Sequence, residues 1–254
     1  MPINLGNQKE AQMIYALNNR KVGELSNNLK HFITTLFCFV NDNDVIKAYK
    51  VDDANKTDFV IEINGQEENI SLKTGGAEVV HNEILDNFVD YLRSEGISEE
   101  TIETIKLFHY GDGSTDGTGT RRLGYLDVVS SLKERIKKAN VELNKDVGFV
   151  VDTLYHCVLV GADPKNIPVT AIYFGELEYG VFATKRQIET HFARRTKAGA
   201  YNYMDHLHIG PLLLRPDARY VGKTISDERK RERIVVYWPR FSADLEFISK
   251  RYDY

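Results

Sequence analysis

The sequence predicts an α/β (α+β) fold in which a mixed β-sheet is flanked by helices and the C-terminal half is rich in strands. Three observations support this prediction. Apolar residues recur at helical spacing near the N-terminus, two β-rich runs flank residue 65, and several short apolar runs follow one another beyond residue 150. The change from helical spacing to short apolar runs predicts an approximate domain boundary between residues 1–140 and 141–254.

Each expected element has a local reason in the sequence. Helices are predicted where apolar residues repeat at i, i+3, i+4 and i+7, and Ser98 is a typical N-cap. In the first half these elements are helices at 8–18 and 29–40, a strand at 48–51, a hairpin of strands 58–63 and 69–74, and helices at 81–93, 98–108 and 126–139. In the second half they are strands at 157–160, 169–174, 180–184, 206–214 and 233–238, and helices at 186–192 and 243–248.

Composition excludes several classes of protein. The 254 residues can bury a substantial core, and 42% hydrophobic with 28% charged residues is ordinary for a folded protein. The two cysteines, Cys38 and Cys157, lie in apolar patterns and are expected to be small core residues, which argues against a disulfide scaffold or a cysteine zinc site. No leader-like segment and no long apolar run is found, so we expect a cytoplasmic protein without membrane contact.

Charge is distributed unevenly along the chain. Residues 1–110 carry 10 Lys and Arg against 18 Asp and Glu, whereas residues 185–233 carry 12 against 6. The acidic half could hold a metal ion, and the basic stretch could contact a phosphate backbone or be a solvated face.

The predicted hairpin carries the clearest chemical signal. Asp58 begins its first strand, and Ser71 and Lys73 share one face of the second because side chains alternate along a strand. A hairpin brings the start of its first strand beside the end of its second, so we expect Asp58 and Lys73 to meet. A carboxylate that holds a hard cation and a nearby ammonium that acts on water and phosphate are the groups that phosphodiester hydrolysis needs.

Thr57-Asp58 followed by Ser71-Leu72-Lys73 resembles the PD-(D/E)xK nuclease signature. The wider layout is similar to small type II restriction endonucleases that cut four-base palindromes such as GCGC and CCGG. The shared features are an N-terminal helix with an acid, the strand–hairpin–strand motif, a following helix and a β-rich second half. The resemblance covers most of the chain in outline and residues 56–75 in motif detail. It implies a restriction-endonuclease-like core, Mg²⁺ as cofactor and double-stranded DNA as substrate.

Two positions depart from the signature. Thr57 replaces a proline, which affects only the backbone path, and Ser71 replaces the second acid, which removes a direct metal ligand. Glu83 and Glu10 are the candidates to replace that ligand, and Glu62 is a weaker third. Ser71 is then expected to hydrogen-bond to the ligands, and the site to hold one metal ion or two, or to be degenerate.

The remaining candidates concern DNA contact. The glycine-rich segment 109–122 lacks the spacing of a calcium or phosphate loop, so it is interpreted either as a loop whose Arg121 and Arg122 touch DNA or as a solvated loop. The basic, aromatic-containing stretch 185–223 is the other candidate surface. Its expected DNA-binding residues are Arg194, Arg195, Lys197, Tyr201, Asn202, His206, His208, Arg215, Arg219 and Lys223.

Taken together, the sequence predicts a Mg²⁺-dependent deoxyribonuclease, a type II restriction endonuclease in which Asp58, Ser71, Lys73 and Glu83 form the catalytic site. Asp58 with Glu83 or Glu10 would bind the metal. The alternatives are a repair or phage-defence nuclease without a fixed recognition site, a DNA-binding protein whose catalytic site has decayed, and an unrelated enzyme. The recognition sequence, the cut position and the choice between monomer and homodimer are left open.

Overall fold

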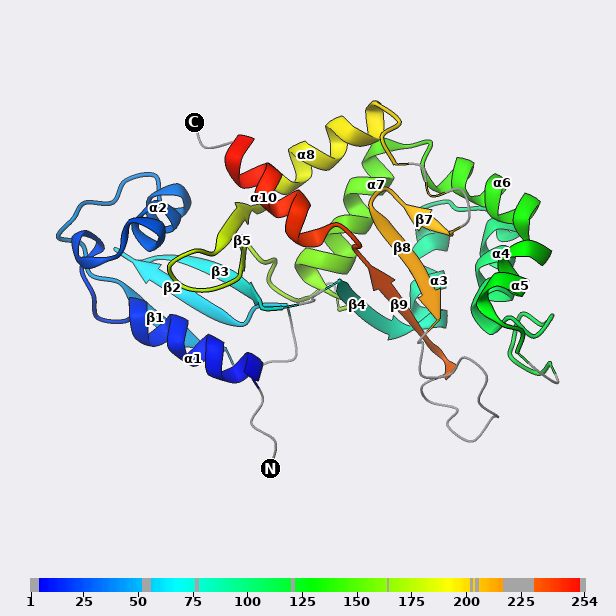
Figure 1. The fold of residues 1–254 in the computed structure, drawn as a ribbon, viewed down its shortest axis with the longest axis horizontal. Coiled ribbons are helices and arrows are strands. Elements are labelled where there is room, and N and C mark those ends of the chain that lie inside the picture. Colours follow the sequence, from blue (N-terminus) through cyan, green and yellow to red (C-terminus); the bar gives the residue numbers. More distant parts are fainter. Residues whose placement is uncertain are drawn as a thin grey trace. The chain divides into compact units, whose positions relative to one another are not determined.

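The computed structural model describes residues 5–51, 56–75, 78–119, 122–163, 165–201, 203, 206–216 and 231–251. The chain is a mixed α/β protein that divides into two compact units (Figure 1). Unit 1 consists of residues Met1–Ala77, Leu159–His191 and Phe241–Tyr254, and unit 2 of residues Glu78–Val158 and Phe192–Arg240. The two units interleave along the chain, so they do not follow the sequential boundary expected near residue 140.

Unit 1 is built on a five-stranded mixed sheet in the order β1-β2-β3-β5-β6. Its strands are β1 (Lys47–Lys50), β2 (Phe59–Ile63), β3 (Gln66–Lys73), β5 (Ala171–Phe174) and β6 (Val181–Thr184). Neighbouring strands are antiparallel except β3 and β5, which run parallel with Ile70 opposite Ala171 and Lys73 opposite Phe174. A parallel pair cannot be joined by a tight turn, so the chain must leave the sheet after β3 and return at β5. This return is the reason for the interleaved units.

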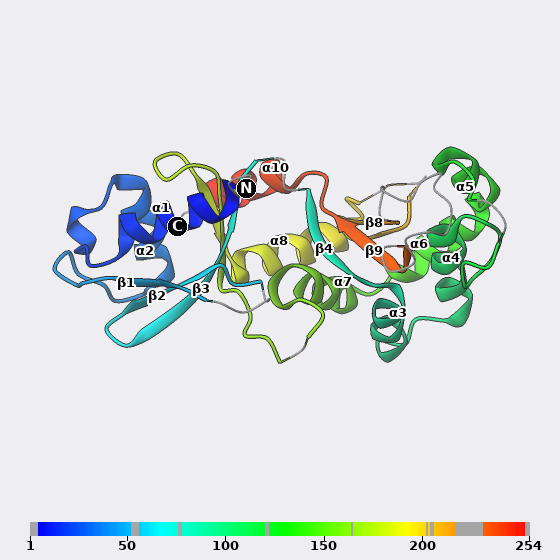
Figure 2. The same cartoon turned by 90° about the horizontal axis from the view of Figure 1, so that it is seen from below.

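One face of this sheet forms the core of unit 1. Helices α1 (Leu5–Leu17) and α2 (Asn27–Leu36) cover it, and Figure 2 shows both on one side of strands β1 to β3. Phe59, Ile61 and Ile63 point into this core from alternate positions of β2 and are at most 2% exposed. Ser71 and Lys73 therefore project from the opposite face, because they alternate with Ile70 and Leu72 along β3.

The turn of the β2–β3 hairpin is shorter than the sequence suggested. β3 begins at Gln66, so Asn64 and Gly65 alone connect the strands, with φ angles of 53° and 80°. Positive φ at both central residues is the geometry of a type I′ turn, which matches the twist of paired strands and favours Asn-Gly. The predicted hairpin is confirmed, and its register follows from this turn.

Two further helices contribute to unit 1. α8 (Lys185–Lys197) starts directly after β6 and belongs to unit 1 as far as His191, and α10 (Phe241–Arg251) packs on β6. Phe241 meets Phe174 edge to face with ring centroids 5.6 Å apart, and Ile188, Leu245 and Ile248 are fully buried. Both predicted helices are confirmed and extend beyond their expected limits.

Unit 2 contains a four-stranded antiparallel sheet in the order β4-β9-β8-β7. Its strands are β4 (Val79–Ile84), β7 (His208–Ile209), β8 (Leu212–Pro216) and β9 (Arg233–Tyr237). Its helical segments are α3 (Leu85–Ser94), α4 (Glu99–Tyr110), α5 (Tyr125–Ser131), α6 (Lys133–Leu143), α7 (Val147–Leu154) and the π-helix η2 (Tyr155–Val160), which belongs to unit 2 as far as Val158.

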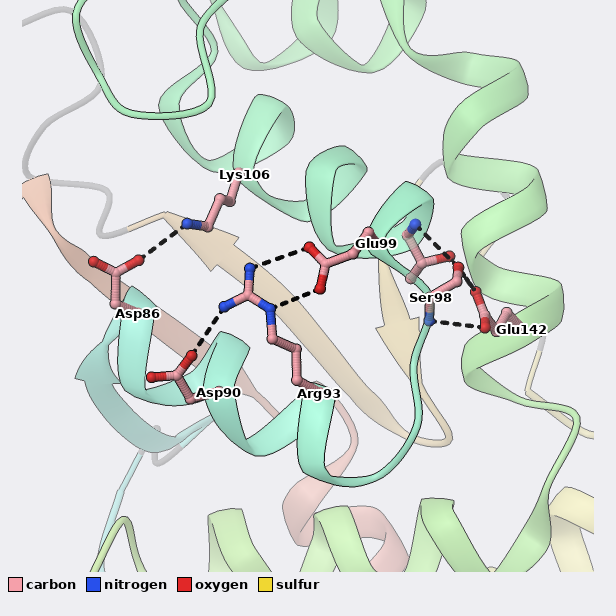
Figure 3. A network of polar contacts seen from close by, with 8 residues as sticks. Asp86, Asp90, Arg93, Ser98, Glu99, Lys106 and Glu142 are labelled. Carbon is pink, nitrogen blue, oxygen red and sulfur yellow. Dashed lines mark hydrogen bonds and ion pairs between the residues drawn. The ribbon is translucent and has the colours of Figure 1, made fainter.

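Side-chain contacts connect helices α3, α4 and α6 (Figure 3). Arg93 donates to both carboxylate oxygens of Glu99 at 2.7 and 3.1 Å. Ser98 caps α4 as predicted, by accepting a hydrogen bond from the Thr101 amide, and it donates to Glu142 of α6 at 2.6 Å. Because Arg93 and Glu99 are exposed, their pairing contributes less than Ser98, whose cap satisfies backbone groups.

Several local expectations are wrong. The single strand expected at 206–214 is the antiparallel pair β7 and β8, and the single helix expected at 126–139 is divided between α5 and α6. Residues 81–84 were expected to begin a helix but belong to β4, because they pair with β9 far along the chain. Residues 157–160 were expected to form a strand and instead end the π-helix η2. Cys38 is exposed rather than buried because α2 ends at Leu36, whereas Cys157 is buried as expected.

Among the helices formed by the described residues, none combines the length and the apolar character that crossing a lipid bilayer requires.

The type I′ turn gives a stability prediction. Replacing Gly65 by alanine places a Cβ at φ 80°, so we expect the free energy of unfolding to fall by about 1 kcal/mol. The matched change Asn64→Gly keeps the turn geometry and is expected to alter stability by less than about 0.5 kcal/mol. Urea unfolding followed by circular dichroism measures both, and equal stability of the two variants would contradict this account of the turn.

Candidate active site

The Asp58 carboxylate is fixed by the neighbouring strand. Its Oδ2 atom accepts a hydrogen bond from the Leu72 backbone amide at 2.6 Å and another from Ser71 Oγ at 3.2 Å. The Asp58 amide in turn donates to the Ile70 carbonyl at 2.9 Å, which continues the β2–β3 ladder by one residue. Among the described residues, no donor reaches Oδ1. The hairpin therefore holds the carboxylate through Oδ2.

Two charges act on Asp58 from nearby. Burial is the largest influence and raises its pKa, the positive charge of Lys73 lowers it, and the negative charge of Glu10 raises it again. Lys73 makes no ion pair within 4.0 Å to any residue that the structure describes. Of the expected site residues in unit 1, Ser71 is hydrogen-bonded to Asp58, and Lys73 and Glu10 act on its carboxyl group electrostatically. That Asp58 and Lys73 act together on one phosphate stays a prediction.

Glu10 lies on α1, with its side chain 15% exposed, and Lys50 Nζ donates to its Oε2 at 3.0 Å. Glu62 shares the Asp58 face of β2 but pairs with Lys47 of the edge strand β1 at 2.8 Å. Of these two acids, Glu10 is the one whose negative charge is among the main influences on the pKa of Asp58. Glu10 is therefore the better partner for Asp58 within unit 1.

Glu83 lies in unit 2, on strand β4 rather than on the expected helix. Its Oε1 atom is hydrogen-bonded to the Nε2 atoms of His81, at 2.8 Å, and His156, at 3.0 Å. These bonds lower the pKa of Glu83 to about 2, against the opposing effect of its burial. That Glu83 binds a metal together with Asp58 stays a prediction.

Sequence reasoning missed the two histidines. His156 stands 73 residues after Glu83, and β4 was taken for a helix, on which His81 and Glu83 would not share a face. The alternation of side chains along a strand was the one signal that could have placed His81 and Glu83 on the same face.

The glycine-rich loop is organised by its own side chains. The Asp112 side chain is fully buried and accepts hydrogen bonds from the Ser114 amide and hydroxyl and from the Arg231 guanidinium. Asp116 similarly bonds the amide and hydroxyl of Thr118. Burial and the charge of Arg231 lower the pKa of Arg122 to about 10. Arg122 therefore packs within this loop, and Arg121 lies outside the described residues.

The basic residues expected to bind DNA have different environments. Arg194 and Lys197 are exposed in the last turn of α8, where positive charge also complements the helix dipole. Arg195 lies over the ring of Tyr201, 5.2 Å from its centroid, and Arg215 lies over Tyr237 at the same distance. Arg194 and Lys197 are therefore the best placed of this set for contact with a phosphate backbone.

The two histidines of this stretch contact protein groups. The imidazole of His206 is hydrogen-bonded to the Tyr125 hydroxyl, and His208 is 4% exposed with its Nδ1 3.2 Å from the Gly210 carbonyl. Asn202, Arg219 and Lys223 lie outside the described residues.

No model of a known protein family matches the chain, and no curated protein matches it significantly.

The buried His109 predicts a pH dependence. Its burial lowers its pKa to about 4, and Nε2 donates to the Arg231 carbonyl at 2.6 Å. The unfolded chain binds the proton near pH 6.5 and the folded chain only near pH 4, so stability falls as the pH drops through this window, by up to about 3 kcal/mol.

Urea unfolding at pH 7 and pH 4.5 measures this loss in the natural chain and in His109→Gln. The variant is expected to lose less stability between the two pH values because its amide does not titrate. Equal losses in both proteins would contradict the assignment.

Proposed function

We propose that this protein is a Mg²⁺-dependent endonuclease that hydrolyses phosphodiester bonds of double-stranded DNA, most specifically a type II restriction endonuclease with a short recognition sequence. The observation that carries the proposal is the Asp58 carboxylate fixed on the β2–β3 hairpin beside Lys73. The order of the sheet adds support. The mixed sheet, with the meander β1-β2-β3 followed by the parallel strand β5, supports the proposal as the kind of mixed α/β scaffold that the motif implies.

The donor set fits a hard cation. Asp58 and Glu10 supply carboxylate oxygens, the ligand type that Mg²⁺ prefers, and Glu10 raises the pKa of Asp58 as closely spaced acids do. Ser71 is 1% exposed and donates to Asp58, so it orients the ligand rather than replacing the missing acid. Mg²⁺, when bound, would neutralise phosphoryl oxygens and lower the pKa of a coordinated water.

Lys73 would act on the reacting groups themselves. Its side chain projects from the same sheet face as Ser71 and is close enough to Asp58 to lower the carboxyl pKa. An ammonium at this place would hold a proton near the scissile phosphate, orient the attacking water and stabilise the negative charge that accumulates in the transition state. Asp58 and Ser71 fix the geometry from which Lys73 works.

Contact with DNA is supported by charge. The exposed Arg194 and Lys197 belong to a stretch with 12 basic against 6 acidic residues. Such residues release counterions when they neutralise phosphates, which makes binding dependent on salt.

Removing the Lys73 ammonium tests the catalytic proposal. In plasmid cleavage with Mg²⁺, we expect Lys73→Ala to lower the rate by at least about 100-fold and EDTA to abolish cleavage by the natural chain. Lys47→Ala removes an exposed strand lysine that pairs with Glu62 and should leave cleavage unchanged. Unimpaired cutting by Lys73→Ala would defeat the mechanism.

Two further outcomes separate the alternatives. Discrete fragments from digested genomic DNA support a restriction enzyme, whereas a smear supports a nuclease without a fixed site. Salt-sensitive binding with no cleavage in Mg²⁺ or Mn²⁺ would instead favour a DNA-binding protein in which Ser71 marks a lost catalytic acid.

The basic end of α8 gives a binding prediction. We expect the double variant Arg194→Ala/Lys197→Ala to bind all DNA sequences more weakly, with the slope of log affinity against log salt reduced by roughly 2. The control, Lys133→Ala/Lys137→Ala, removes the same charge from an exposed face of α6. Fluorescence anisotropy at several salt concentrations measures both, and an equal change in the two variants would indicate a general charge effect instead of a contact surface.

A further inference from the structure

A second cluster of potential metal ligands lies in unit 2. His81 and Glu83 come from β4 and His156 from the π-helix η2. The two imidazole Nε2 atoms lie 2.8 and 3.0 Å from the same carboxylate oxygen of Glu83, and all three ligand atoms are within 4.8 Å of one another. The side chains are 4%, 4% and 16% exposed. Three donors therefore converge at a site that is almost fully removed from solvent.

Local structure explains the convergence. His81 and Glu83 alternate with Asn82, so both point to the same side of β4. The third ligand, His156, comes from a π-helical turn. This is a rare conformation that proteins often retain at functional sites. The His156 ring is stacked on Tyr91 at 4.2 Å with an interplanar angle of 4°, which fixes its orientation. Each ligand is thus held in place by the backbone or by packing.

The second oxygen of Glu83 is an independent sign of a ligand. Oε2 is buried and has no hydrogen-bond partner among the residues that the structure describes. A buried carboxylate oxygen without a partner costs free energy. A cation bound by Glu83 would remove this cost, either through both oxygens or through a bound water that bonds Oε2.

We propose that His81, Glu83 and His156 bind one transition metal ion of the Zn²⁺ class. Two imidazoles and one carboxylate are a typical set for Zn²⁺, whereas Mg²⁺ prefers oxygen ligands alone. Tetrahedral ligation with bonds of about 2.0–2.1 Å separates neighbouring donors by about 3.3 Å. The observed 2.8 and 3.0 Å separations would need to widen by only a few tenths of an ångström.

This ion is distinct in kind from the Mg²⁺ proposed at Asp58. Its ligands come from unit 2 alone, so the site does not depend on whether the hairpin of unit 1 cleaves DNA. With three protein ligands, a fourth position is open to water or to Glu83 Oε2. Its folding role would be to tie β4 to η2, two segments far apart in the sequence.

Co²⁺ binding tests the proposal without any nuclease assay. The full chain is stripped with EDTA and titrated with Co²⁺, and we expect intense visible d–d absorption that saturates at one equivalent and is lost on addition of Zn²⁺. Zn²⁺ should also raise the melting temperature of the stripped protein, because it binds the folded state. Absence of both effects in the natural chain would overturn the proposal.

Variants locate the ion. Glu83→Gln and His156→Gln should bind Co²⁺ at least about tenfold more weakly, because each loses a ligand. His156→Cys keeps a donor and should restore binding, with a new thiolate-to-cobalt charge-transfer band. Glu99→Gln is the matched control, because it changes an exposed acid of unit 2 that belongs to neither proposed metal site, and it should keep the natural spectrum.

Circular dichroism in EDTA verifies that each variant is folded before titration. If a glutamine variant does not fold, the charge-transfer band of His156→Cys alone locates the ion. Unchanged Co²⁺ spectra in folded Glu83→Gln, or no such band in His156→Cys, would show that the ion is bound elsewhere.

Discussion

The hydrogen bond from the Leu72 amide to Asp58 is the interaction on which the proposed chemistry depends. At 2.6 Å it fixes a partly buried carboxylate against the adjacent strand, and Ser71 adds a second bond to the same oxygen. A side chain held in this way keeps its orientation without a cation. The side-chain entropy is therefore lost on folding, and it is not lost again when a cation binds. The Asn64–Gly65 turn sets the register that makes these bonds possible.

The sheet determines which other groups can reach this carboxylate. Ser71 and Lys73 stand at the C-terminal end of β3, where β3 runs parallel to β5. Because a parallel pair needs a long return path, the chain between these strands has room for most of unit 2. The chemical groups of unit 1 thus come largely from one short hairpin and from α1, whereas the sheet that supports them is completed from distant segments.

The sequence was informative where structure is local. The β2–β3 hairpin, the Ser98 cap and the amphipathic helix α2 follow from neighbouring residues, although the two-residue turn was not anticipated. β4 was misassigned because Ile84, Leu85 and Phe88 continue a helical apolar pattern, whereas its pairing partner β9 lies about 150 residues away. The apolar residues 157–160 fit a buried strand as well as a π-helix, an ambiguity that periodicity cannot resolve. The His81–Glu83–His156 cluster joins β4 to the π-helix η2, two elements that the sequence did not predict, so the pattern alone could have paired only His81 with Glu83.

Sequencing the ends of fragments made from random DNA tests the central claim most directly. With Mg²⁺, the natural chain is predicted to produce ends that share one short palindrome, while the Lys73→Ala chain leaves the same DNA intact. DNA that stays whole with the natural chain, or identical ends from both proteins, would contradict a catalytic centre at Asp58 and Lys73.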